Sequence, residues 1–337
     1  MMSDINLRIQ GKAGRITLQR PEALNAMTYE MCLAIEKTLI DWKYDPKVEL
    51  IIIDAQGERA FCSGGDISDL YEAGNKKNYN YGKKFWDDEY RLNALIAKYP
   101  KPYIAFMQGF TMGGGVGISC HGSHRIVCET SKIAMPECSI GLIPDVGGSL
   151  LLSRAPNNLG YFLGLTGTQM NAADAIYTGF ADSYIPKSEW SEVIEKLEQS
   201  GNNSILREHS QNSGKSQLAE NSEFFEAIFT SKDLPKIVQF LSKSEDQRAL
   251  EALNKITKNC PIAMTYTIEM LSRLTPKSKI EDALDLEYRF TSRAQEHGSF
   301  QEGIRAAIID KDRKPKWRFE IDDCLLYTSP SPRDLRK

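Results

Sequence analysis

The strongest constraint on the fold of this sequence is a short apolar run that ends in a glycine-rich loop, a combination that occurs twice. Residues 48–55 form the first run and lead into a glycine pair within residues 60–67. Residues 103–107 form the second run and lead into residues 108–117, which contain five glycines. Apolar runs of this length are typical of strands buried on both faces, and residues 83–99 between them have a helical pattern. The order strand, loop, helix, strand predicts an α/β architecture with crossover connections.

The composition excludes several classes of protein. Of the 337 residues, 41% are apolar and 26% are charged, which is enough to build a sizeable core and too apolar for a disordered chain. No apolar stretch approaches the roughly 20 residues of a membrane helix. The net charge of −3 argues against a dedicated nucleic-acid or anionic-membrane surface, so we expect neither nucleic acid nor a membrane as a partner.

The cysteines and histidines bear on compartment and metal binding. The seven cysteines are an odd number, form no Cys-x-x-Cys pair and lie mostly within apolar runs, as reduced thiols do in a cytosolic protein. The first residues show no basic segment followed by an apolar one, so the sequence predicts a cytoplasmic location. His121 and His124 are three positions apart without a third ligand nearby, and we expect no metal site.

The residue pattern and local composition divide the chain into three parts. Residues 1–200 hold the strand and loop pattern, which begins with a hairpin predicted from the alternating residues 5–10 and 15–18. After a polar stretch, the remainder of residues 201–322 has an almost entirely helical pattern. Residues 323–337 are rich in Pro and Ser without periodicity, and we interpret them as a non-native or disordered tail outside the fold.

The two glycine loops are candidate binding elements. Glycine at a strand end lets backbone N–H groups approach a ligand closely, and the start of a helix favours negative charge. Two such loops together are able to aim two N–H groups at one developing oxyanion. Each loop taken alone is better explained as a tight turn.

A third segment, residues 135–148, places Glu137 and Asp145 eight positions apart among apolar, Pro and Gly residues. Charged groups are rarely buried without a reason, and buried carboxylates acquire pKa values suited to acid–base chemistry. Two alternatives stay open for this segment. The acids are solvated in a surface loop, or Asp145 is the N-cap of a helix that begins at Val146.

In this order the three segments resemble the crotonase (enoyl-CoA hydratase/isomerase) superfamily, and the similarity extends from about residue 5 to residue 317. The resemblance implies a crotonase ββα spiral core followed by a helical C-terminal region, with an acyl-CoA thioester as substrate. It also implies that the backbone N–H groups of Gly65 and Gly114 bind the thioester oxyanion. CoA then arrives as part of the substrate, no separate cofactor or metal is needed, and assembly into a homo-oligomer stays open.

One departure from the hydratase pattern points to a particular family. The resemblance places one of the two catalytic acids of hydratases at the position of Gly117, and the Pro-Gly turn of hydratases is Pro144-Asp145 here. This arrangement resembles the 3-hydroxyisobutyryl-CoA hydrolases of valine catabolism, and it implies hydrolysis of a short 3-hydroxyacyl-CoA thioester. Glu137 is then the nucleophile or the general base, and Asp145 orients the water or the substrate hydroxyl.

The same resemblance assigns Glu89, Asp66 and Ile67 to the substrate pocket, although Glu89 is also explained as a solvated acid in an acidic helix. It further predicts that Gly117→Glu, added to an Asp145→Gly variant, supports weak hydration of crotonyl-CoA. Two other functions stay open. One is an enoyl-CoA hydratase or isomerase that uses a single glutamate, and the other is a non-catalytic acyl-CoA-binding protein.

Overall fold

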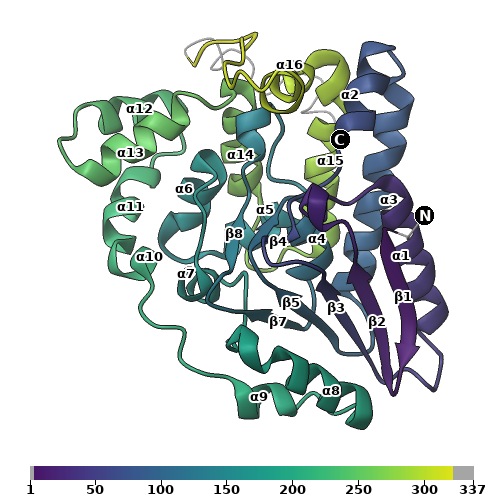
Figure 1. The fold of residues 1–337 in the computed structure, drawn as a ribbon. Coiled ribbons are helices and arrows are strands. Elements are labelled where there is room, and N and C mark those ends of the chain that lie inside the picture. Colours follow the sequence, from purple (N-terminus) through teal and green to yellow (C-terminus); the bar gives the residue numbers. More distant parts are fainter. Residues whose placement is uncertain (1–3, 322–337) are drawn as a thin grey trace.

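The computed structural model describes residues 4–321, which form a mixed α/β fold built on two sheets (Figure 1). The larger sheet has the strand order β1-β2-β3-β5-β7-β9, and the smaller sheet has the order β4-β6-β8. The strands are β1 (Ile5–Gln10), β2 (Ala13–Leu18), β3 (Leu50–Ala55), β4 (Ala60–Cys62), β5 (Tyr103–Met107), β6 (Phe110–Met112), β7 (His124–Val127), β8 (Lys132–Ala134) and β9 (Ser183–Tyr184).

Helices surround the two sheets and make up most of the C-terminal part. The α-helices are α1 (Tyr29–Trp42), α2 (Ser68–Asn75), α3 (Tyr79–Ala97), α4 (Gly114–Ser119), α5 (Gly148–Arg154), α6 (Leu159–Thr166), α7 (Ala172–Tyr177), α8 (Trp190–Ser200), α9 (Ile205–His209), α10 (Gln217–Glu220), α11 (Ser222–Phe229), α12 (Leu234–Ser242), α13 (Gln247–Ile256), α14 (Pro261–Arg273), α15 (Ile280–His297) and α16 (Phe300–Ile304). Short 3₁₀ or π turns are η1 (Pro21–Ala23), η2 (Glu137–Ile140), η3 (Pro156–Asn158), η4 (Lys187–Glu189) and η5 (Arg305–Ile309).

A repeated unit links the two sheets. β3 is followed by β4, β5 by β6, and β7 by β8, so each pair places one strand in each sheet before the chain enters helical structure. The neighbouring strands β3, β5 and β7 are parallel, as are β4, β6 and β8. Successive ββα units therefore wind into a spiral, which confirms the α/β class and the spiral core expected from the sequence.

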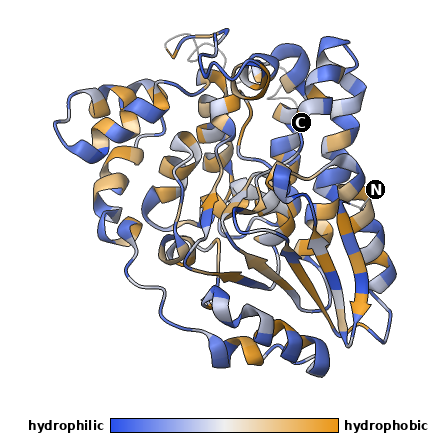
Figure 2. Ribbon diagram, viewed as in Figure 1, coloured by the Kyte–Doolittle hydropathy of each residue, from blue (hydrophilic) through white to orange (hydrophobic). Residues whose placement is uncertain are grey.

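The N-terminal hairpin is also confirmed. β1 pairs antiparallel with β2, from Ile5 opposite Leu18 to Gln10 opposite Ala13, and β2 then pairs parallel with β3. The side chains of β3 from Leu50 to Ile53 are completely buried, as its unbroken apolar sequence predicts for a strand covered on both faces. Figure 2 shows the same concentration of hydrophobic residues along the central strands.

The small sheet positions the site. Since β4, β6 and β8 are parallel neighbours, their carboxyl ends lie at one edge, where α/β proteins commonly bind ligands. Gly65 follows the end of β4, Gly114 follows the end of β6, and Glu137 follows the end of β8, each after two or three residues. Three segments that are far apart in the sequence are thereby brought to one place.

The C-terminal helices pack directly on the spiral core. α15 lies along α3, and α3 also packs against α1 (Figure 1). One cluster of buried apolar side chains extends from Ile5 to Ile304. The domain boundary expected near residue 200, where α8 ends, stays a prediction, and the tail expected at residues 323–337 lies outside the described residues.

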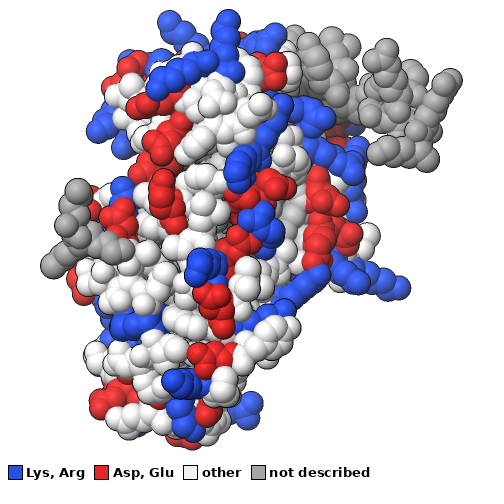
Figure 3. Space-filling view, turned by 90° about the vertical axis from the view of Figure 1, so that its right-hand side faces the viewer, with Lys and Arg blue, Asp and Glu red and all other residues white. Residues whose placement is uncertain are grey.

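The surface carries charges of both signs. Figure 3 shows acidic and basic side chains interspersed over the face at the right of Figure 1, in keeping with the small net charge. Several form pairs within one helix, such as Lys37 and Asp41 of α1 at 3.0 Å. Within residues 4–321, none of the helices combines the length and the apolar character needed to cross a bilayer.

Candidate active site

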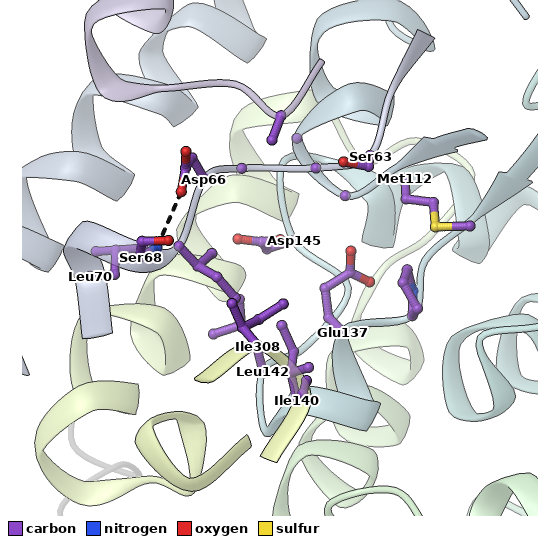
Figure 4. Close-up of a pocket in the computed structure, with 18 of the residues that line it drawn as sticks. Ser63, Asp66, Ser68, Leu70, Met112, Glu137, Ile140, Leu142, Asp145 and Ile308 are labelled. Carbon is purple, nitrogen blue, oxygen red and sulfur yellow. Dashed lines mark hydrogen bonds between the residues drawn. The ribbon is translucent and has the colours of Figure 1, made fainter. Parts of the chain in front are cut away.

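The carboxyl edge of the small sheet opens onto a cavity of about 690 Å³. Its walls include the glycine loops after β4 and β6, the η2 turn, α3 and the η5 turn near the C-terminal end of the described chain. Figure 4 shows Glu137 and Asp145 pointing into this cavity, with Ile140, Leu142 and Ile308 on one side and Ser63 and Met112 on the other. The cavity therefore combines the carboxylates of Glu137 and Asp145 with apolar side chains.

The backbone N–H groups of Gly65 and Gly114 are available to a ligand. Within residues 4–321 neither group donates a hydrogen bond to another part of the chain. A Cβ atom on Gly114 would lie 3.2 Å from the Gly65 nitrogen and 3.1 Å from Glu89 Oε1. Only glycine at this position leaves the space between the two donors open, and this arrangement suits a two-donor oxyanion hole.

Glu137 is the first residue of η2 and faces the glycine loop. A Cβ atom on Gly113 would lie 2.9 Å from Glu137 Oε1, so the loop and the carboxylate are in close approach. The side chain is buried, and its Oε2 atom has no hydrogen-bond partner among the described residues. Burial, reinforced by the neighbouring Asp145, raises the pKa of Glu137 well above its usual range. An unpaired buried carboxylate is costly to keep, and such groups are characteristic of functional sites.

Asp145 lies on the other side of the cavity and is held by α3. Tyr90 of α3 donates a hydrogen bond to Asp145 Oδ2 at 2.9 Å. Burial raises the pKa of Asp145, while the hydrogen bond from Tyr90 opposes that rise. The N-cap alternative is wrong, because the cap of α5 is Gly147 and the Asp145 side chain accepts no hydrogen bond from the start of this helix; there, only the backbone carbonyl of Asp145 accepts one, from Gly148 N.

The residue after Asp145 has a strained backbone. Val146 has a φ of 54°, a left-handed conformation that a β-branched residue rarely adopts. Such strain costs about 1–3 kcal/mol and persists only where surrounding contacts enforce it. His121 Nε2 lies 2.8 Å from the Val146 carbonyl oxygen, which accounts for one of these contacts.

Glu89 is a buried residue of α3 and lines the cavity. Its side chain is 3% exposed, so the alternative of a solvated helix acid is wrong. Burial, with the nearby Asp145 and Glu287, raises the pKa of Glu89 well above its usual range. The structure thus places Glu89 beside the oxyanion donors, where the resemblance located a pocket residue.

Asp66 and Ile67 follow Gly65 and also line the cavity. The Asp66 carboxylate is engaged with the protein, since Arg20 lies 3.2 Å from its Oδ2 and the Ser68 N–H lies 3.4 Å from its Oδ1 (Figure 4). Asp66 is therefore suited to shaping the loop, whereas Ile67 contributes apolar wall. Whether either residue contacts the substrate stays a prediction.

Position 117, where the resemblance places the second acid of hydratases, is closely packed. Gly117 lies in α4, and a Cβ atom on it would be 2.7 Å from Asn93 Nδ2 and 2.8 Å from Val146 Cβ. The space of a side chain at this position is already filled by α3 and by the strained turn. This packing counts against room for a glutamate here, and hydration by a variant with a glutamate at this position stays a prediction.

Three buried residues of this region were missed in the sequence. Tyr90 and Asn93 lie one and four positions after Glu89 on α3, and Asn93 has no hydrogen-bond partner for its amide among the described residues. Glu287 of α15 is completely buried beneath the Asp145 turn. A signal for Glu287 existed, because it falls at helical spacing with the buried Ala283 and Thr291.

The arrangement suits acid–base or nucleophilic chemistry at a carbonyl group. Four buried carboxylates lie in this region, and burial raises the pKa of each: Glu89, Glu137, Asp145 and Glu287. Neighbouring acids raise the pKa of Glu89, Glu137 and Glu287 further, and no described cation offsets these rises. Burial raises the pKa of Asp145 to about 7 and that of Glu287 to about 8, so these two groups are able to hold or release protons near neutral pH. Within the described ranges no cluster of three His, Cys, Asp or Glu side chains is arranged to hold a metal ion.

Comparisons with known proteins agree with this fold. The enoyl-CoA hydratase/isomerase family description matches residues 13–323. A protein of Danio rerio named 3-hydroxyisobutyryl-CoA hydrolase, mitochondrial, is 35% identical over 99% of this chain and 92% of its own length.

Two solved structures are also similar over nearly the whole chain. One is titled an enoyl-CoA hydratase from Rhodobacter sphaeroides 2.4.1, with 46% identity, a TM-score of 0.91, and coverage of 99% of this chain and 96% of that one. The other is titled a carnitinyl-CoA dehydratase from Mycobacterium thermoresistibile, with 37% identity, a TM-score of 0.90, and coverage of 99% and 98%. By matched length, sequence identity and fold, this chain belongs to the enoyl-CoA hydratase/isomerase family.

Proposed function

We propose that this protein hydrolyses 3-hydroxyisobutyryl-CoA to 3-hydroxyisobutyrate and CoA. The names of its curated relatives give 3-hydroxyisobutyryl-CoA as the substrate of those proteins. The observation that carries the proposal is that one cavity holds two backbone N–H groups that donate no hydrogen bond within the described residues, at Gly65 and Gly114, and the Oε2 atom of Glu137, which has no hydrogen-bond partner there. A thioester carbonyl presents both an oxygen for the donors and an electrophilic carbon for the carboxylate or for water.

The chemistry follows from these positions. The carbonyl oxygen accepts hydrogen bonds from the Gly65 and Gly114 N–H groups, and one such donor is typically worth about 2.7–4 kcal/mol in the transition state. Glu137 either attacks the carbonyl carbon and expels CoA, leaving a mixed anhydride that water cleaves, or takes a proton from an attacking water. In the first route water attacks the Glu137 carbonyl of the anhydride, so the product acid keeps an oxygen from Glu137 and water replaces that oxygen in Glu137. In the second route water supplies the new oxygen of the acid directly. In both routes the CoA sulfur leaves as a thiol.

The other two cavity carboxylates suit a substrate that carries a hydroxyl group. Asp145 and Glu89 line the same cavity as Glu137, and each is buried. A buried carboxylate that accepts a hydrogen bond from a substrate hydroxyl rejects analogues without that group, because the acceptor is then left unpaired. We infer that Asp145 and Glu89 favour 3-hydroxyacyl thioesters over unsubstituted ones.

Hydration of an enoyl-CoA is the second candidate, since the Rhodobacter sphaeroides structure at 46% identity carries that title. The packing at Gly117 counts against it, because Asn93 and Val146 fill the space of the second hydratase acid. A hydration mechanism here therefore depends on Glu137 with Asp145 or Glu89 as its partner. We rank hydrolysis first on this ground.

Cofactor use, assembly and compartment are further proposals. The carboxylates and N–H groups supply the proton transfers and charge stabilisation that hydrolysis needs, so we propose that neither a metal nor an organic cofactor takes part. Six described cysteines have free, buried thiols, which supports a cytoplasmic location. A homo-oligomer is compatible with these proposals.

Two substrates separate the candidate functions. The purified protein is incubated with 3-hydroxyisobutyryl-CoA and with crotonyl-CoA, and both free thiol and enoyl absorbance are followed. Thiol release from the first substrate alone supports the hydrolase, and loss of enoyl absorbance from the second supports the hydratase. No change with either, despite measurable CoA-ester binding, supports a non-catalytic binding protein and contradicts the proposal.

A variant at Asp145 tests the assignment further. Asp145→Gly is expected to lose thioester hydrolysis while it still binds CoA esters, because both glycine loops remain. Asp87→Asn, which removes an exposed carboxylate of the same helix α3 that holds Asp145 through Tyr90, serves as the control and should behave like the parent. Full activity of Asp145→Gly would remove the main local support for the hydrolase.

A further inference from the structure

Glu287 reaches from the C-terminal helix α15 to the turn that carries Asp145. Its Oε2 accepts a hydrogen bond from Gly147 N at 2.8 Å, and its Oε1 accepts one from Ser149 N at 3.2 Å. The Ser149 hydroxyl also donates to Oε1. The side chain is completely buried, and these three donors all belong to the segment that directly follows Asp145 and Val146.

The turn held by Glu287 does not keep its shape by local preference. Val146 has a φ of 54°, and its carbonyl oxygen lies 2.8 Å from His121 Nε2. Glu287 accepts hydrogen bonds from the backbone N–H groups one and three positions after Val146, so the strained residue is bracketed by His121 and by Glu287. A strained conformation at a functional site requires surroundings that over-determine it, and these contacts provide them.

The same helix also meets the hydrogen bond that orients Asp145. Tyr90 Oη lies 2.9 Å from Asp145 Oδ2 and 3.2 Å from Thr291 Oγ1, and Thr291 is one turn after Glu287 on α15. The backbone and the carboxylate of Asp145 are thus both linked to α15. The groups that face this region are Glu89 and Tyr90 from α3, Glu137 from η2 and His121 after α4.

We propose that Glu287 is a positioning residue of the active site, which holds the Asp145–Ser149 turn so that the Asp145 carboxylate faces the bound thioester. This proposal rests on the hydrolase activity proposed above. Glu287 acts without touching the substrate, through Gly147 and Ser149, and it makes the helical C-terminal region part of the catalytic apparatus. The N-cap residue Gly147 and Ser149 in the first turn of α5 supply the three donors that satisfy the oxygens of this buried side chain.

Glu287→Gln tests the proposal, because it keeps the size of the side chain but places an amide NH₂ where a carboxylate oxygen accepted a hydrogen bond from the backbone. One of the two backbone donors then loses its acceptor. We expect kcat for 3-hydroxyisobutyryl-CoA to fall on the order of 10- to 100-fold, as positional errors near 1 Å cost, with KM changed less than about threefold. Asp285→Asn, which alters an exposed carboxylate on the same helix, is the matched control and should leave both parameters unchanged.

A double-variant comparison separates positioning from general packing. If Glu287 acts through Asp145, Glu287→Gln should lower the residual rate of an Asp145→Asn protein by less than about threefold. An equal fall in both backgrounds, or a parent-like kcat in Glu287→Gln, would overturn the proposal. Inactivity of the parent itself would instead contradict the proposed function.

Ser149→Ala guards against a Glu287 variant that fails to fold. It removes one of the three donors to Glu287 and leaves both backbone bonds in place. A smaller fall in kcat, with KM and the melting temperature near those of the parent, supports the positioning role. Parent-like turnover of Ser149→Ala, combined with an unfolded Glu287→Gln protein, assigns Glu287 to folding and overturns the proposal.

Discussion

Tyr90 donates its hydroxyl proton to Asp145 Oδ2 at 2.9 Å, across 55 positions of sequence. The two residues belong to different units of the spiral, and both are buried. The bond stabilises the charged form of Asp145 and therefore opposes the rise in pKa that burial causes. Tyr90 thus helps to keep a buried carboxylate ionised beside the thioester site.

Tyr90→Phe tests this relationship through the pH dependence of the rate. Loss of the bond removes an interaction that favours the charged form, so the pKa of Asp145 should rise and the acidic limb of kcat should move to higher pH. At neutral pH we expect a rate loss on the order of 10-fold, corresponding to about 1.4 kcal/mol. Tyr99→Phe, which loses a hydroxyl bond to the Leu39 carbonyl outside the cavity, is the control. An unshifted acidic limb in Tyr90→Phe would show that Asp145 does not titrate in this step.

Glu137→Gln keeps the size of the side chain and removes the nucleophile or base. We expect turnover to fall by roughly 10²–10⁴-fold, the range that general-base catalysis spans. Repeated turnover in ¹⁸O-water, followed by mass spectrometry of peptides, then separates the routes in the parent. Label in the Glu137 carboxylate supports the anhydride, whereas an active enzyme with unlabelled Glu137 supports direct attack by water. Activity unaffected by Glu137→Gln would exclude both.

Gly114→Ala and Gly114→Val test the oxyanion hole in two steps. A Cβ atom at this position meets Gly65 N at 3.2 Å and Glu89 Oε1 at 3.1 Å, so alanine already narrows the space between the donors. We expect a graded loss of kcat that reaches at least about 100-fold with valine, in line with the loss of one donor. Circular dichroism establishes whether the fold survives. Near-full activity of the valine variant would place the oxyanion elsewhere.

Glu89→Gln tests how much the buried acid lowers the free energy of unfolding. The folded-state pKa of Glu89 lies above its unfolded value, so its protonated form is favoured by folding. The stability it contributes is complete below the unfolded pKa, near 4.3, and is lost as pH rises through the folded pKa. The free energy of unfolding of Glu89→Gln should therefore exceed that of the parent increasingly from pH 5 to pH 8, on the order of 1–3 kcal/mol.

Denaturant unfolding at several pH values measures this difference. Asp87→Asn on the same helix is the control, because its carboxylate is exposed and its replacement should add no such pH dependence. If the difference between Glu89→Gln and the parent is the same at pH 5 and pH 8, Glu89 does not change its protonation on folding. Loss of turnover in Glu89→Gln, together with the gain in stability, would connect the cost of this acid to function.

Much of the fold and of the site follows from local patterns. The apolar runs at β3 and β5 predicted buried strands, and the glycine loops after β4 and β6 predicted close approach of the backbone to a ligand. The motif order identified the family, and the names of the curated relatives agree with the predicted hydrolase. These features were visible because strand burial and glycine loops depend on residues that are adjacent in the sequence.

Which acids are buried could not be predicted from the sequence. Glu89 lies in an acidic stretch with Asp87 and Asp88, and only the packing of α15 on α3 decides that Glu89 is covered while Asp87 is exposed. The same holds for position 117, where the sequence shows a missing acid. The structure shows that Asn93 and Val146 have taken its space.

The sequence by itself determined the α/β class, the glycine loops and the two carboxylates of residues 135–148, since each rests on short-range periodicity or spacing, and the order of these motifs implied the spiral through the family resemblance. Only the tertiary structure decided how Asp145 is held, because its supports come from far along the chain. Tyr90 lies 55 positions before it, and Glu287 binds Gly147 across 140 positions. Hydrogen bonds between such distant residues depend on how α3 and α15 pack, which is a property of the whole core rather than of any segment.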